Sequence, residues 1–121
     1  MKVMIFVKAT KDSEAGVPPD PEAIEAMHNF NEALAAAGIL QDQILGGLMP
    51  SRFAKRVRFS GKKLTVIDGP FTETKELIAG FALWDVKSIE EALEWAKKCP
   101  VATDCEVEIR PVYSPEMFDP A

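Results

Sequence analysis

Hydrophobic positions along the chain predict five β-strands of two kinds. Residues 3–7 and 77–84 are apolar at nearly every position, which is typical of strands buried on both faces of a sheet. Apolar and polar residues alternate instead in 56–59, 64–67 and 107–113, as expected for strands with one face in water. The first two of these half-exposed strands are predicted to form a hairpin.

Two helices are predicted from capping residues and from apolar positions spaced three and four residues apart. The first follows Asp20, whose side chain suits an N-cap, and ends at Gly38. The second follows Ser88, with Glu91 placed for a reciprocal capping box, and stops before Pro100. The apolar face of the first helix consists of Ile24, Met27, Phe30, Leu34 and Ala37.

The order strand, helix, hairpin, strand, helix, strand predicts an α+β fold, a ferredoxin-like (split βαβ) subunit with an extra strand. Right-handed crossovers place both helices on one face of the sheet, which leaves Phe6 and Phe81 on a face that the chain does not cover. A soluble monomer rarely exposes so large an apolar face. We therefore expect a homodimer in which two sheets pack together.

The remaining segments and the composition indicate a single soluble domain. Residues 12–19 and 41–52 are expected to be loops, and residues 114–121 a C-terminal tail on a domain of residues 1–113. The net charge of −5 argues against nucleic acid or an anionic membrane as a partner. The N-terminal apolar run is too short for a signal peptide or a membrane span, so we expect a cytoplasmic protein.

Metal and cofactor sites are not predicted. Cys99 and Cys105, with one histidine, are too few for a zinc centre or a disulfide framework, and we expect reduced thiols. Gly46-Gly47 is too short for a phosphate-binding loop, so no nucleotide cofactor is expected.

The segment from Asp68 to Leu77 holds the densest group of polar residues between two predicted strands. One interpretation is a rigid turn, in which Asp68 accepts hydrogen bonds from amides two residues on and Gly69-Pro70 shapes the backbone. The other is a cleft in which Asp68, Glu73, Lys75 and Glu76 bind a ligand or transfer protons.

Three further residues are candidates for the same site. His28 is the only side chain whose unperturbed pKa lies near neutrality, and it would form an acid–base pair if Asp68 or Glu73 reached it; a surface or interface histidine is the alternative. Ser51 and Arg52 are candidates for binding an anionic ligand, whereas the neighbouring basic residues also suit a solvated strand face.

The sequence resembles the YCII-related proteins of the DGPF type over nearly its whole length. The resemblance is carried by Asp68-Gly69-Pro70-Phe71 and by the segments 47–51, 57–59, 66–81 and 88–96. It implies a dimeric α/β barrel built from ferredoxin-like subunits. It implies little about the reaction: some relatives are associated with extracytoplasmic-function sigma factors, and some carry out small-molecule chemistry such as dehalogenation.

The histidine–aspartate pair proposed as an active site in shorter relatives is not present here. The corresponding positions hold Met27 and Cys99, which leaves Asp68 as the candidate catalytic residue. Two functions follow as hypotheses. One is a homodimer that binds a small polar or anionic organic molecule, with acid–base chemistry. The other is a non-catalytic accessory or regulatory module, linked to sigma-factor signalling.

Overall fold

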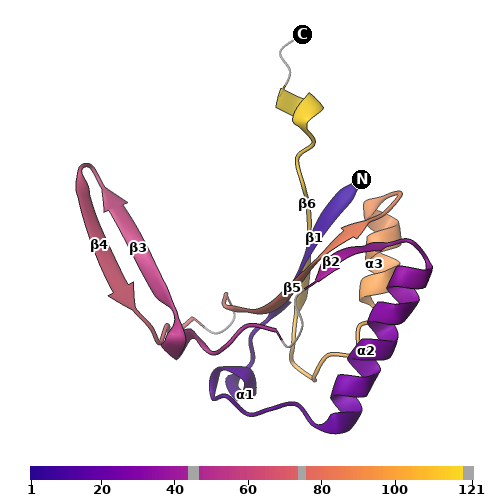
Figure 1. Ribbon diagram of the computed structural model, residues 1–121, viewed down its shortest axis with the longest axis horizontal. Helices are drawn as coiled ribbons and strands as arrows, with labels where there is room; N and C mark the ends of the chain where they lie inside the picture. The colour runs from indigo at the N-terminus through magenta and orange to yellow at the C-terminus, as the bar shows by residue number, and fades with distance from the viewer. Residues whose placement is uncertain (44–46, 74–75, 119–121) are drawn as a thin grey trace.

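The computed structural model describes residues 1–43, 47–73 and 76–118, which form an α+β fold with two separate antiparallel sheets (Figure 1). The larger sheet has the strand order β2-β5-β1-β6. Its strands are β1 (Lys2–Lys8), β2 (Leu40–Gln43), β5 (Ile78–Asp85) and β6 (Val107–Pro111). The smaller sheet is a hairpin of β3 (Lys55–Ser60) and β4 (Lys63–Asp68).

Both long helices lie on the same face of the larger sheet, as predicted (Figure 1). They are α2 (Pro21–Ala36) and α3 (Ile89–Ala96). A short helix, α1 (Lys11–Glu14), overlaps the segment 12–19 that was expected to be a loop. Two 3-10 helices complete the described chain, η1 (Ser51–Phe53) and η2 (Pro115–Phe118).

The predicted caps explain where α2 and α3 begin. The Asp20 carboxylate accepts a hydrogen bond from the Ala23 amide at 2.8 Å, and the Ser88 hydroxyl accepts one from the Glu91 amide at 3.2 Å. The reciprocal half of the predicted capping box is wrong. Glu91 reaches one residue further back and accepts from the Lys87 amide at 2.9 Å, so it does not bond to the Ser88 backbone.

The hydrophobic core lies between the helices and the larger sheet. It consists of Val3, Ile5, Leu34, Ile39, Trp84, Val86 and Ala92. The Phe30 ring packs between two tryptophans, with centroid distances of 6.2 Å to Trp84 and 6.4 Å to Trp95. Ile24 was predicted in this core but is exposed, because the first turns of α2 extend past the edge of the sheet (Figure 1).

The pairing of β1 with β5 confirms that the two fully apolar segments lie side by side in the middle of the sheet. β1 and β5 are antiparallel neighbours in the middle of the sheet, with Phe6 opposite Phe81. β6 carries Pro111 at the edge of the sheet, where a missing N–H is tolerated. The order of elements fits a ferredoxin-like subunit, whereas the dimeric barrel stays a prediction.

The sequence predicts one strand more than a ferredoxin-like subunit has. In the structure the additional element is the whole β3–β4 hairpin, which lies outside the larger sheet. β2 overlaps the segment 41–52 that was expected to be a loop, and it pairs with β5 at the edge of the larger sheet. Its sequence, Leu-Gln-Asp-Gln, is too short and too polar to show a strand pattern. Among the described strands, β3 and β4 pair only with each other and form a separate sheet.

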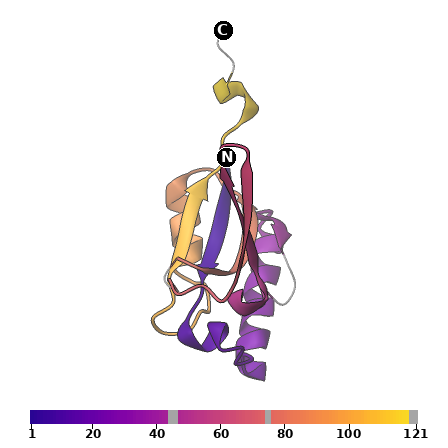
Figure 2. The same cartoon turned by 90° about the vertical axis from the view of Figure 1, so that its left-hand side faces the viewer.

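We call residues 55–68, which comprise β3, β4 and the turn between them, the arm. The arm projects from the body on the side of the sheet opposite α2 and α3, and it stands in front of the sheet face that has no helices (Figure 2). At the other end of the chain, η2 extends away from the body rather than along its surface (Figure 1). Among the described residues, no helix is long and apolar enough to cross a membrane.

Candidate functional site

Ser51 lies at the base of the arm and is the one buried polar residue of the described chain, at 6% exposure. Its backbone amide donates to Glu14 Oε1 at 2.9 Å, and its hydroxyl donates to Oε2 of the same carboxylate at 2.5 Å. Hydrogen bonds to an ionised acceptor are stronger than neutral ones. The Glu14 carboxylate therefore holds the start of η1 against α1, although the two residues are 37 positions apart in the sequence.

The returning strand of the arm is fixed to the same point. The Phe71 amide donates to Ser51 Oγ at 2.9 Å, and the Gly69 amide donates to the Ala54 carbonyl at 2.9 Å. Gly69 approaches so closely that a Cβ atom added there would lie 1.7 Å from the Ser51 carbonyl oxygen. Glycine is therefore required for the close contact between the end of β4 and η1 at the base of the arm. We call this group, Glu14, Ser51, Gly69 and Phe71, the arm junction.

Asp68 closes the arm just outside the junction. It pairs with Lys55 across the first register position of the hairpin, with Lys55 Nζ 2.6 Å from Asp68 Oδ1, and both side chains are largely exposed. The hydrogen bond predicted from the amide two residues on does not form, because that residue is Pro70 and has no N–H. Beside this pair, the Arg56 guanidinium stacks 3.6 Å from the centroid of the Phe71 ring.

The structure brings some of the predicted ligand-binding residues to the junction. Arg52 is exposed beside Ser51, where its guanidinium donates to the Glu14 carbonyl at 3.5 Å and lies 4.7 Å from the Phe53 ring centroid. Glu73 has an exposed side chain, and its carbonyl accepts from two amides just before β5. Lys75 lies outside the described residues. Sequence reasoning missed Glu14, which stood in a segment expected to be a loop.

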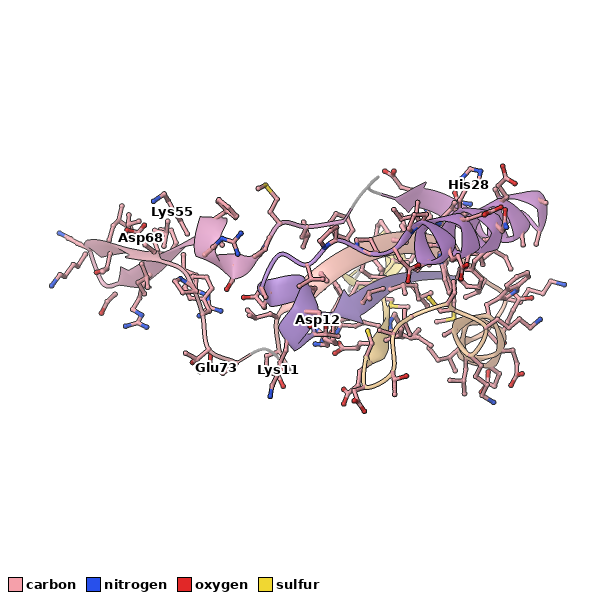
Figure 3. All side chains as sticks on the ribbon, turned by 90° about the horizontal axis from the view of Figure 1, so that it is seen from below. Lys11, Asp12, His28, Lys55, Asp68 and Glu73 are labelled. Carbon is pink, nitrogen blue, oxygen red and sulfur yellow. The ribbon has the colours of Figure 1, made fainter. Side chains whose placement is uncertain are left out.

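His28 is far from this group. It lies on the outer side of α2 with its Nε2 3.0 Å from Glu32 Oε1, one helical turn away. Figure 3 shows His28 and Asp68 at opposite ends of the molecule. The predicted acid–base pair of His28 with Asp68 or Glu73 therefore does not form within one chain.

A second polar group lies on the sheet face that has no helices. Lys8 Nζ is 3.2 Å from Glu108 Oε1, and the Lys8 side chain is only 13% exposed. Arg110 donates to the other oxygen of Glu108, and its guanidinium carbon lies 5.8 Å from the Phe6 ring centroid. The hydrogen bond from Lys8, assisted by Arg110, holds the pKa of the Glu108 carboxyl below its ordinary value.

The aromatic residues of this face adjoin the charged group. Phe6 pairs with Phe81 on one side and with Glu108 on the other, so all three side chains point away from the helices. We call Phe6, Lys8, Phe81, Glu108 and Arg110 the open-face group. The alternation in β6 was visible in the sequence, but the pairing of Lys8 with Glu108 depends on the strand register.

Two hollows of the described surface lie away from Asp68 and Glu73. An open hollow of about 380 Å³ lies on the helix side, lined by Ala37, Gly38, Ile39, Asp85, Val86, Lys87, Glu91 and Trp95. A smaller one, of about 60 Å³, adjoins the open-face group at Lys8 and Glu106. A single chain therefore presents the open-face group as a surface.

Both cysteines are free, and burial makes them poor nucleophiles. Burial, with a smaller effect from Cys105, raises the pKa of Cys99 to about 11, and burial also raises the pKa of Cys105. At pH 8 we expect iodoacetamide to alkylate Cys99 about 100-fold more slowly than an unperturbed thiol, because only the thiolate reacts. Mass spectrometry of the two cysteine peptides over time measures this. Reaction of Cys99 at the rate of a free thiol would contradict its burial.

A comparison with protein-family models matches residues 1–116 to the YCII-related domain. The chain belongs to the YCII-related family. This YCII-related protein is also 46% identical over 50 residues to an uncharacterized protein of Rhizobium meliloti (strain 1021). That match covers 41% of this chain and 40% of the relative, so the chain spans less than half the length of that protein.

Proposed function

We propose that this YCII-related protein is a homodimer that binds a small polar or anionic organic molecule on the open face of its sheet, beside the segment that follows Asp68. The observation that carries the proposal is the open-face group. Phe6 and Phe81 offer an aromatic surface for a flat apolar part of a ligand. Arg110, which is 68% exposed, offers planar donors for a carboxylate or another anion.

The dimer supplies the enclosure that one chain lacks. Ligand sites bury most of a small molecule, whereas a single chain exposes this face. A second copy packed against it excludes water and strengthens each charge–charge contact there. Lys8 Nζ, 3.2 Å from Glu108 Oε1, then neutralises the charge of that carboxylate.

The acid–base part of the proposal rests on Asp68. Its carboxylate is exposed at the base of the arm, which stands on the side of the sheet that has no helices (Figure 3). His28 would take part only if a second chain brought it to this site, because one chain keeps the two residues apart.

A non-catalytic accessory or regulatory module is the second candidate function, including one that works with sigma factors. The arm favours it, since exposed apolar residues on a projecting hairpin suit a protein contact. On this alternative, the residues around Asp68 serve to hold the arm, and no metabolite binds the open face.

A metabolite screen by thermal shift separates the two functions. We expect aromatic or other organic carboxylates to raise the melting temperature of the wild type, and Arg110→Gln to weaken binding at least about tenfold, because it removes a charge-assisted hydrogen bond. Lys97→Gln is the matched control: it removes the same charge from the helix side, where Lys97 pairs with Glu94.

The outcomes assign the function. A ligand that binds wild type and Lys97→Gln alike but binds Arg110→Gln poorly supports the open-face site. If that ligand is also turned over, Asp68→Asn should retain binding and lose turnover. If no ligand in a broad metabolite set stabilises the protein, the accessory module is favoured. If a ligand binds Arg110→Gln as tightly as the wild type, the open-face site is wrong.

A further inference from the structure

Charge is divided unequally between the arm and the rest of the chain. The arm holds five basic residues and one acidic residue, Asp68, so its net charge is +4. Because the whole chain carries −5, the remaining residues carry −9. The arm is therefore a positive element that projects from a strongly negative body (Figure 1).

One face of the arm is apolar and exposed. The cross-strand pairs Val57–Val66 and Phe59–Leu64 point to the same side of the hairpin. Their exposures are 51% for Val57, 62% for Val66, 75% for Phe59 and 63% for Leu64. An isolated two-stranded hairpin has marginal stability in water, so these side chains require a covering surface.

The arm junction gives the arm a fixed starting direction. Ser51 joins the incoming strand to Glu14 of α1 and the returning strand to the Phe71 amide. The Gly69 amide adds a bond between the two strands themselves. The arm stands apart from its own body (Figure 1), and its apolar face is left exposed by the described residues of the same chain.

We infer that the arm docks on the body of a second copy of the chain, and that the second copy returns the same contact. The body of a second copy has the complementary charge, −9 against +4, and a symmetric dimer covers both arms at once. Apolar contact by Val57, Phe59, Leu64 and Val66 supplies the affinity, and the five cations orient the arm. The inference rests on the homodimer of the proposed function and names the element that holds it together.

Nucleic acid is the competing partner for a basic hairpin, because a two-stranded ribbon fits the major groove. The exposed apolar pairs favour protein, since contact with nucleic acid is dominated by phosphate contacts and does not require an apolar surface of this kind. The body charge of −9 would also repel a polyanion.

Sedimentation velocity of the full chain at micromolar concentrations tests the inference. We expect the wild type to be a dimer and Val57→Thr/Phe59→Thr to raise its dissociation constant at least about 100-fold, because threonine keeps the strand propensity and removes apolar contact. Ile24→Thr is the matched control, since Ile24 is exposed on α2, away from the arm. Circular dichroism and thermal unfolding check that each variant folds.

A second variant tests the charge without altering the apolar face. Lys62→Glu/Lys63→Glu, at the tip of the arm, should raise the dissociation constant about tenfold at low salt and by less at high salt, because ions screen exposed charges. The same proteins are titrated with a short DNA duplex.

Each outcome has one meaning. A wild-type monomer would overturn both the docked arm and the proposed dimer. A wild-type dimer that both arm variants leave unchanged would overturn the docked arm alone and keep the dimer and its ligand site. If the wild type binds the duplex, and Lys62→Glu/Lys63→Glu loses that binding while its dimer is unchanged, the arm binds nucleic acid and not a second copy.

Discussion

Replacing Gly69 with alanine is expected to lower the free energy of unfolding by about 3 kcal/mol or more. The added Cβ atom would lie 1.7 Å from the Ser51 carbonyl oxygen and 2.7 Å from the Ser51 carbonyl carbon, and both are backbone atoms that cannot rotate away. The strands at the base of the arm would have to separate, which would also break the bond from the Gly69 amide to the Ala54 carbonyl. Urea unfolding followed by circular dichroism measures the loss.

Gly80→Ala is the matched control for this substitution. Gly80 lies in β5, and apart from Gly80 and its chain neighbours no described residue has an atom within 4 Å of the position that its Cβ would take. Alanine there should change stability by less than about 1 kcal/mol, and the change should be favourable if the unfolded chain loses freedom. Equal stability of the two variants would contradict the close approach of Gly69 to Ser51.

The Asp-Gly-Pro-Phe segment shows how far the sequence could predict this structure. A rigid turn was one of two interpretations, and the structure shows a bend at Gly69 without the local hydrogen bond predicted for Asp68. The reason differs at each residue from the one that local turn chemistry suggests. Gly69 serves a close contact with η1, and Asp68 pairs across the hairpin with Lys55.

The junction itself was beyond sequence reasoning, because its bonds join residues that are distant along the chain. Glu14 and Ser51 are 37 positions apart, and Phe71 is 20 positions further on. No periodic pattern marks them, since α1 has only four residues and η1 only three. The long helices and the central strands were predictable because burial repeats along each of them.

The open-face group was predictable in part. Alternation placed Phe6 and Phe81 on the sheet face without helices, and the structure confirms it. The ion pair of Lys8 with Glu108 was not predictable, because it requires the register of β1 against β6, which places Phe6 opposite Glu108. A one-residue change of register would turn these side chains toward the helices.

Ser51→Ala is expected to cost about 2–3 kcal/mol of unfolding free energy. The substitution removes a hydroxyl that donates to the Glu14 carboxylate and accepts from the Phe71 amide, and it leaves both groups part-buried without that partner. Glu14→Ala should cost a similar amount, because it removes the acceptor of the Ser51 hydroxyl and amide. Thermal and urea unfolding of each variant give the two values.

The double variant decides whether the two residues act as one unit. If the Ser51 hydroxyl works through Glu14, the cost of the double variant should fall short of the sum by about 1 kcal/mol or more. Ser60→Ala, at the exposed end of the arm, should lie within about 0.5 kcal/mol of the wild type and serves as the control. Strict additivity would mean that Ser51 stabilises the junction through Phe71 alone.

Because the junction sets the direction of the arm, the Ser51 and Glu14 variants should also weaken the dimer that the arm is proposed to hold. An arm that docks independently of its base would leave dimerisation unchanged.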